Sequence, residues 1–124
     1  RFGGGPRFSS NPMIPLIGSP MPLLEKALLF PLIGFIGPLF EEILFRGFLY
    51  GSLRKVLSPL PAMLLISLLF SYLHNDPAGF LPIFVLGFLL AYVYEKTGSL
   101  VSSIALHSLW NSFIFLVAVA YFWS

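Results

Sequence analysis

The stretch GPLFEEILFRGFLYGSL, from Gly37 to Leu53, decides how the rest of the chain is interpreted. It places two adjacent carboxylates, Glu41 and Glu42, and the guanidinium of Arg46 inside a run that otherwise has the composition of a membrane helix. A charged side chain in the middle of such a helix costs at least about 2.5 to 3.5 kcal/mol, and these residues usually face the bundle interior and serve a function there. We therefore expect the three residues to face the inside of a helix bundle.

The composition of the whole chain indicates that its solvent is a lipid bilayer. Of the 124 residues, 57% are hydrophobic and 10% are charged, whereas an ordinary soluble domain has about 25% charged residues. The net charge is only +2 and no basic run is present, so we expect membrane lipid and no nucleic acid as a partner. The absence of cysteine from the sequence excludes disulfides, thiolate zinc sites and a cysteine nucleophile.

Four apolar segments predict an all-α, polytopic transmembrane helix bundle of about four spans, and hence an integral, multi-pass membrane protein. Pro31 and Pro38 interrupt the first segment, which forms either one long kinked helix or a helix broken near Gly37 and Pro38. The third segment is short for a full crossing, which takes about 20 residues. The four segments run approximately over residues 23–50, 60–74, 79–94 and 99–123.

The remaining segments separate or flank these spans. Residues 1–22, rich in Gly, Pro and Ser, predict a loop or linker ahead of one membrane domain at residues 23–124. Residues 51–58 predict a short polar turn between the first two spans. In the third span, Gly87 and Ala91 form a pair of small residues four apart, which predicts a close approach of two helices.

The polar residues of the first span divide into a pair and a remaining carboxylate. Glu42 and Arg46 are four residues apart, so they share a helical face and can pair. Glu41 is rotated by about 100° from Glu42, which leaves it as the candidate working carboxylate. The alternatives are an ion cluster that only locks the helix, or a helix end at the water surface with glutamate in its first turn after Pro38.

Two further pairs lie on later spans, and each alone has an ordinary structural explanation. His74 follows Phe70 by four residues at the end of the second span, where the helix dipole favours a histidine in any case. We assign Phe70 to packing. His107 and Asn111, also four apart, share a face of the last span. As an isolated pair they would be interpreted as hydrogen-bonding groups between membrane helices.

Taken together, these residues can converge on one cavity and hydrolyse an amide bond. A carboxylate can take a proton from water, and histidine or asparagine can donate to a developing oxyanion. No serine lies in a recognisable nucleophile motif. Zinc needs about three protein ligands plus water, and Glu41, His74 and His107 would supply them. The residue chemistry alone leaves metal-dependent and metal-free hydrolysis open.

The order of these motifs is similar to that of a known family, the CPBP intramembrane proteases. This family comprises CAAX prenyl endopeptidases and the bacteriocin-processing or self-immunity proteins of the Abi group. The resemblance rests on three motifs on successive spans, Glu41-Glu42-x-x-x-Arg46, Phe70-x-x-x-His74 and His107-x-x-x-Asn111. Two shorter stretches, Phe45 to Gly47 and Tyr94 to Leu100, are also similar to the family. The resemblance departs in extent, because family members usually carry additional spans upstream.

The resemblance implies an intramembrane endopeptidase that hydrolyses a peptide bond of a membrane-associated or lipidated substrate. It implies that Glu41 activates the water with help from His74, and that His107 and Asn111 hold the oxyanion. The residues that would shape and support the site are Glu42, Arg46 and Phe70.

The cofactor and the functional class have alternatives. The family is often labelled metal-dependent, although a metal-free glutamate mechanism has also been proposed for it. Asn111 suits an oxyanion donor better than a metal ligand, so we expect that no cofactor is required, with zinc as the alternative. A non-catalytic membrane protein would use the same polar bundle to bind a partner or relay protons. A divalent-cation transporter is disfavoured by the few carboxylates and the lack of paired broken helices.

Overall fold

The structure, a computed structural model, describes residues 22–123, with the side chains of residues 22–121. All regular structure in this part of the chain is helical, so the predicted all-α bundle is confirmed. The linker expected at residues 1–22 lies outside the described residues except for Pro22. The elements are α2 (Leu23–Pro31), η1 (Leu32–Ile36), α3 (Gly37–Glu42), η2 (Ile43–Tyr50), α4 (Gly51–Leu53), α5 (Pro59–Leu73), α6 (Phe80–Thr97) and α7 (Leu100–Trp123).

The first span is one continuous helix with two π-helical stretches, η1 and η2, and it is not broken at Pro38. In a π-helix each N–H binds the carbonyl five residues earlier, and the N–H of Gly37 binds the carbonyl of Leu32 in this way. The prediction that a polar turn begins at residue 51 is wrong, because helix α4 continues to Leu53. Residues 54–58, which follow α4, are not helical.

Three helices in the described part of the chain are long and apolar enough to cross a membrane: Leu23–Leu53, α6 and α7. The fourth, α5, is apolar but has only 15 residues. The expectation that the third segment is short for a full crossing was wrong, because α6 has 18 residues and ends only at Thr97. Gly98 has φ +65°, a left-handed conformation that glycine adopts easily at the end of a helix. The chain is an integral, multi-pass membrane protein of about four spans.

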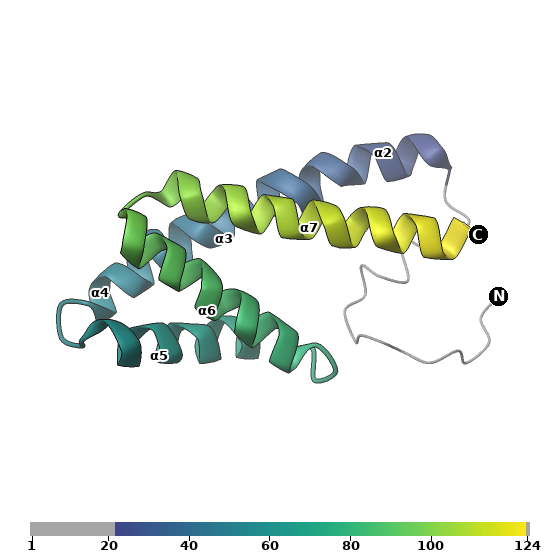
Figure 1. The fold of residues 1–124 in the computed structure, drawn as a ribbon. Helices are drawn as coiled ribbons and strands as arrows, with labels where there is room; N and C mark the ends of the chain where they lie inside the picture. The colour runs from purple at the N-terminus through teal and green to yellow at the C-terminus, as the bar shows by residue number, and fades with distance from the viewer. Residues whose placement is uncertain (1–21, 124) are drawn as a thin grey trace.

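Figure 1 shows α5 and α6 side by side, with α7 lying along the first span and extending past α5 and α6 next to α2. The main core lies where η2, α5 and α6 meet, and a smaller cluster around Phe115 and Ala118 packs α7 against α2 and η1. A Cβ on Gly87 would lie 2.9 Å from Cδ1 of Phe70 and 3.4 Å from Cα of Ser67, and Ala91 is fully buried. The predicted close approach at Gly87 and Ala91 is therefore confirmed.

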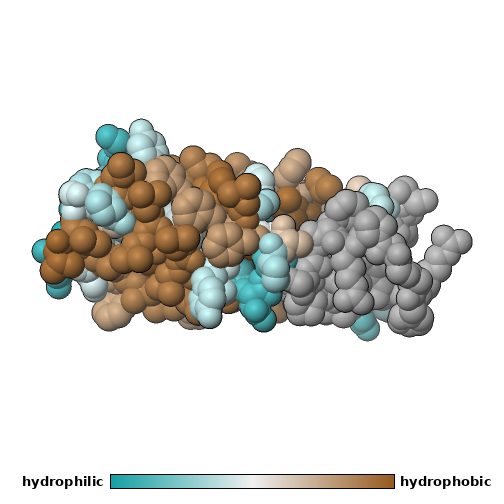
Figure 2. All heavy atoms as spheres, turned by 90° about the horizontal axis from the view of Figure 1, so that it is seen from below, coloured by the Kyte–Doolittle hydropathy of each residue, from teal (hydrophilic) through white to brown (hydrophobic). Residues whose placement is uncertain are grey.

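The outer surface is apolar, as a lipid-facing surface requires. Phe40, Leu44 and Phe48 project outward from the first span, and the exposed fraction of Phe40 is 67%. The face seen in Figure 2 is mostly hydrophobic, with hydrophilic residues gathered toward its edges. The polar groups described below are therefore exceptions on helices whose outer faces are apolar.

Candidate active site

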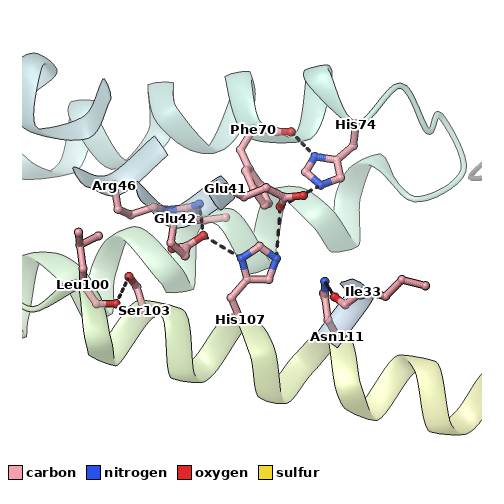
Figure 3. A network of polar contacts seen from close by, with 11 residues as sticks. Ile33, Glu41, Glu42, Arg46, Phe70, His74, Leu100, Ser103, His107 and Asn111 are labelled. Atoms are coloured by element: carbon pink, nitrogen blue, oxygen red, sulfur yellow. Dashed lines mark hydrogen bonds and ion pairs between the residues drawn. The ribbon is translucent and has the colours of Figure 1, made fainter. Parts of the chain in front are cut away.

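Three helical segments bring the polar motif residues to one place in the bundle (Figure 3). Helix α3 and the following η2 supply Glu41, Glu42 and Arg46, and α7 supplies His107. His74 is the first residue after α5, in its C-cap position. Residues that are far apart in the sequence therefore meet across the first, second and last spans.

Glu42 is the centre of a buried ionic network. Its Oε2 accepts hydrogen bonds from Nη1 of Arg46 at 2.9 Å and from Nδ1 of His107 at 2.8 Å. Nη2 of Arg46 donates to the carbonyl of Gly87 at 2.7 Å, which adds a contact to α6. The side chains of Glu42 and Arg46 are fully buried. The predicted pairing of Glu42 with Arg46 is confirmed, whereas the contact of His107 with the same oxygen was not predicted.

Phe70 covers the apolar side of this network. The guanidinium carbon of Arg46 lies 4.5 Å from the centre of the Phe70 ring, a distance at which a cation and a ring face attract. The same ring meets the His74 and His107 rings edge-on, at centroid distances of 4.4 and 5.8 Å. Because Phe70 is fully buried, its predicted packing role is confirmed.

Glu41 has a different environment from its neighbour. Its Oε2 lies 3.5 Å from Nε2 of His107 and 3.7 Å from Nε2 of His74. That oxygen is buried and has no hydrogen-bond partner, although the side chain as a whole is 37% exposed. Polar atoms separated by slightly more than a hydrogen bond are commonly bridged by water. Oε2 of Glu42 is therefore held by Arg46 and His107 while its Oε1 has no hydrogen-bond partner, and Oε2 of Glu41 is the oxygen that lies between the two histidine rings.

The hydrogen bonds of the two histidines determine which ring nitrogen carries a proton. Nδ1 of His74 lies 2.6 Å from the carbonyl of Phe70, which can only accept, so this nitrogen is the donor. Nδ1 of His107 donates to Glu42 in the same way. In the neutral rings both Nε2 atoms are acceptors, and both face the Glu41 carboxylate. Acceptors that converge in this manner require a donor between them, and water is a small donor that can bridge two of them.

Asn111 lies one helical turn beyond His107 and is anchored elsewhere. Its Nδ2 donates to the carbonyl of Ile33 in η1 at 3.1 Å (Figure 3). The structure thus brings Glu41, His74 and His107 together and places Asn111 at the edge of the group. The contact with Ile33 was not predicted, although Pro38, five residues after Ile33, is the sequence signal that could have indicated it.

Zinc at this site would need about three protein ligands. The metal-dependent alternative would use Glu41, His74 and His107 as ligands. Within the described part of the chain, no group of three or more histidine, aspartate or glutamate side chains is arranged to hold a metal ion. We therefore derive no chemical step from a metal at this site.

A second polar cluster, which was not predicted, ties the first span to the end of α6. The hydroxyl of Tyr50 donates to Oε2 of Glu95 at 2.6 Å, and Nε of Arg54 donates to the same oxygen at 3.1 Å. The hydrogen bonds with Glu95 raise the pKa of Arg54 above its ordinary value. Glu95 belongs to the Tyr94 to Leu100 stretch, which could have indicated the cluster. It fixes the helices around the site but contributes no group to it.

The fold and the site define a polytopic helical membrane protein with a carboxylate and histidine centre inside the bundle. Residues 23–113 match the family described as "Type II CAAX prenyl endopeptidase Rce1-like". The chain belongs to this family, and the resemblance to CAAX-type membrane proteases is confirmed.

Two relatives illustrate the relationship. The chain is 34% identical over 108 residues to UPF0177 protein YxdF of Lactococcus lactis subsp. lactis (strain IL1403). The matched residues make up 85% of this chain and 56% of that protein. It is 33% identical over 89 residues to the Membrane-embedded CAAX protease MroQ of Staphylococcus aureus (strain USA300). That match covers 66% of this chain and 36% of MroQ. The chain therefore matches about half or less of the length of these relatives. No solved structure matches it significantly.

Proposed function

We propose that this chain carries the catalytic centre of an intramembrane endopeptidase, which hydrolyses a peptide bond of a membrane-associated or lipidated substrate. Membership of the CAAX prenyl endopeptidase family supports the reaction and the substrate class. MroQ, which is named a membrane-embedded CAAX protease, is a relative that supports the same class. The single observation that carries the proposal is the Glu41 Oε2 atom, which has no hydrogen-bond partner and lies between two histidine Nε2 atoms.

Glu41 is the proposed general base. A water that donates one proton to Glu41 and the other to Nε2 of His74 is held with a lone pair free to attack a peptide carbonyl carbon. As the new carbon–oxygen bond forms, Glu41 takes a proton from the water, and it later delivers that proton to the leaving amine as the carbon–nitrogen bond breaks. His74 is 26% exposed, whereas His107 is 2% exposed, so His74 lies on the side from which a substrate can approach.

His107 is the proposed donor to the oxyanion. Because its Nδ1 is bound to Glu42, its Nε2 donates toward the reacting carbonyl only when the ring is an imidazolium. Glu42 stabilises that cation directly. In this state the two carboxylates of the site are balanced by the imidazolium and by the guanidinium of Arg46. The second N–H of Asn111, on the same face of α7, is the proposed additional donor.

We propose that this reaction needs no metal. The proposed base, the water-holding histidine and the oxyanion donors are all side chains of the chain itself.

The experiment compares Glu41→Gln with Glu25→Gln, a matched substitution at an exposed position of α2. The full-length proteins are reconstituted in liposomes and assayed with quenched fluorescent peptides, with and without a prenyl group. General base catalysis contributes roughly 10²- to 10⁴-fold, so Glu41→Gln should lower kcat/KM by at least about a hundredfold while Glu25→Gln changes nothing. Cleavage that survives in Glu41→Gln would refute the assignment. If the unmodified protein cleaves none of the peptides, the non-catalytic alternative, partner binding or proton relay, is favoured.

A further inference from the structure

The contact between Asn111 and Ile33 compensates for a backbone donor that the first span lacks. At the end of η1 the N–H of Gly37 donates a hydrogen bond to the carbonyl of Leu32. The next carbonyl, that of Ile33, would be paired in the same π-helical pattern with the N–H of residue 38. Residue 38 is proline and has no N–H. The Nδ2 of Asn111 donates to that carbonyl from α7, at 3.1 Å.

A carbonyl left without a donor inside a membrane protein is costly, because lipid offers no hydrogen bond to replace it. Pro38 is fully buried, so water at the surface of the protein does not take over this role. The contact of α7 with η1 is also close at the next residue, where a Cβ on Gly34 would lie 2.9 Å from Oγ of Ser112. The first span and α7 are therefore packed tightly at the level of the missing N–H.

The π-helical stretch also determines the direction of Glu41. A π-turn contains about one residue more than an α-turn, and one residue corresponds to about 100° of rotation around a helix. Glu41 lies only three residues after Pro38 in the same continuous helix. A contact that holds η1 in the π conformation against α7 therefore keeps Glu41 directed toward His107.

We propose that Asn111 is a positioning residue, whose side-chain N–H replaces the backbone donor missing at Pro38 and thereby holds η1 against α7. The inference deepens the proposed function, on which its catalytic consequence rests. One N–H of the amide anchors the helix, which leaves the second N–H free for the oxyanion. The contact itself does not depend on catalysis and can be measured without it.

Disulfide formation between Gly34→Cys and Ser112→Cys measures the packing of η1 on α7 directly. A Cβ at position 34 lies 3.9 Å from Cβ of Ser112, and natural disulfides have Cβ–Cβ distances of about 3.5 to 4.5 Å. The sequence contains no other cysteine. The full-length cysteine-pair protein is oxidised in liposomes, and the rate of cross-linking is followed on gels. We expect rapid cross-linking, which Asn111→Ala slows by about tenfold.

The decisive comparison adds Pro38→Ala, which supplies the missing N–H at residue 38. In that background, Asn111→Ala should slow cross-linking by less than threefold. The matched control is Ser103→Ala on α7, whose hydroxyl donates only within its own helix, to Leu100, and it should leave the rate unchanged. A variant of Asn111 that folds only when Pro38 is also replaced supports the proposal in the same way.

Two results would overturn the inference: no slowing by Asn111→Ala, or equal slowing with Pro38 and with alanine at position 38. The cleavage assay separates this failure from a failure of the proposed function. If the cross-linking rates are as expected but the protein cleaves no peptide, the positioning contact stands and only the enzyme proposal is removed. Normal cleavage with unaltered cross-linking in Asn111→Ala would remove both roles of Asn111, the positioning contact and the oxyanion donor, and would leave Glu41 as the proposed base.

Discussion

Replacing Glu42 by glutamine removes the negative charge at the centre of the buried network while keeping the shape of the side chain. In the native protein one oxygen of Glu42 accepts hydrogen bonds from both Arg46 and His107. Glutamine has one carbonyl oxygen and an NH₂ group, which would face groups that are themselves donors. The guanidinium of Arg46 then stays fully buried without its counter-ion.

The magnitude follows from the burial of the pair. Removing one partner of a buried ion pair costs about 3 to 5 kcal/mol, because the other charge stays buried without compensation. Arg46 keeps its hydrogen bond to the Gly87 carbonyl, and Glu41 supplies a second carboxylate in the same site. We therefore expect the lower end, a loss of about 3 kcal/mol in the free energy of unfolding, which is roughly a hundredfold in the folding equilibrium.

The assay is equilibrium unfolding in mixed micelles with increasing SDS, followed by circular dichroism. Glu25→Gln, at an exposed position, serves as the control and should match the native protein. Glu42→Gln combined with Arg46→Met removes both charges and should recover part of the lost stability, because replacing a whole buried pair is often nearly neutral. Cleavage should not recover in the double variant, since His107 still lacks its carboxylate. A loss below about 0.5 kcal/mol in Glu42→Gln would refute this account of the network.

Two further predictions concern packing and metal. Gly87→Ala should destabilise the protein by about 1 to 3 kcal/mol and lower peptide cleavage, since its Cβ would lie 2.9 Å from Phe70 and 3.5 Å from Nη2 of Arg46. By contrast Gly51→Ala, with no atom within 4 Å of the new Cβ, should stabilise α4 by about 0.5 to 1 kcal/mol; equal thermal melting of the two variants would contradict this reasoning. Treatment with a chelator, followed by dialysis, should leave peptide cleavage unchanged, whereas a loss that zinc restores would assign the metal-dependent mechanism.

Local features of this protein could be predicted from its sequence because they depend on residues close together in the chain. The bundle follows from four apolar segments and few charges. The pairing of Glu42 with Arg46 follows from a spacing of four on one helix, and the burial of Phe70 follows from its place on an apolar helix. The close approach at Gly87 follows from its small size and that of Ala91.

Contacts between helices could not be predicted in the same way. His107 and Glu42 are 65 residues apart, and Arg46 and Gly87 are 41 apart. Spacing along a helix shows which side chains share a face, but it does not show which face of another helix they meet. The contact of Asn111 with Ile33, for the same reason, needs both the π-helical pattern and the position of α7.

Helix lengths and helix type were also predicted incompletely. The third apolar segment was expected to end near residue 94, whereas α6 continues through the polar residues Glu95 and Lys96 to Thr97. Glu95 accepts hydrogen bonds from Tyr50 and Arg54, so tertiary contacts favour the helix at residues that alone indicate a turn. The π-helical stretches have no simple periodicity that distinguishes them from an α-helix in the sequence.

The proposed mechanism requires that Glu41 and His74 act on the same water, and a double-mutant cycle on peptide hydrolysis tests this requirement. The measurement is kcat/KM for Glu41→Ala, His74→Ala and the combined variant, in liposomes with one peptide substrate. Residues that act as a unit give strongly non-additive losses, so we predict that the combined variant is no slower than the slower single variant. Losses that multiply, with the combined variant slower by the product of the two single effects, would show that the residues act independently and would contradict the account.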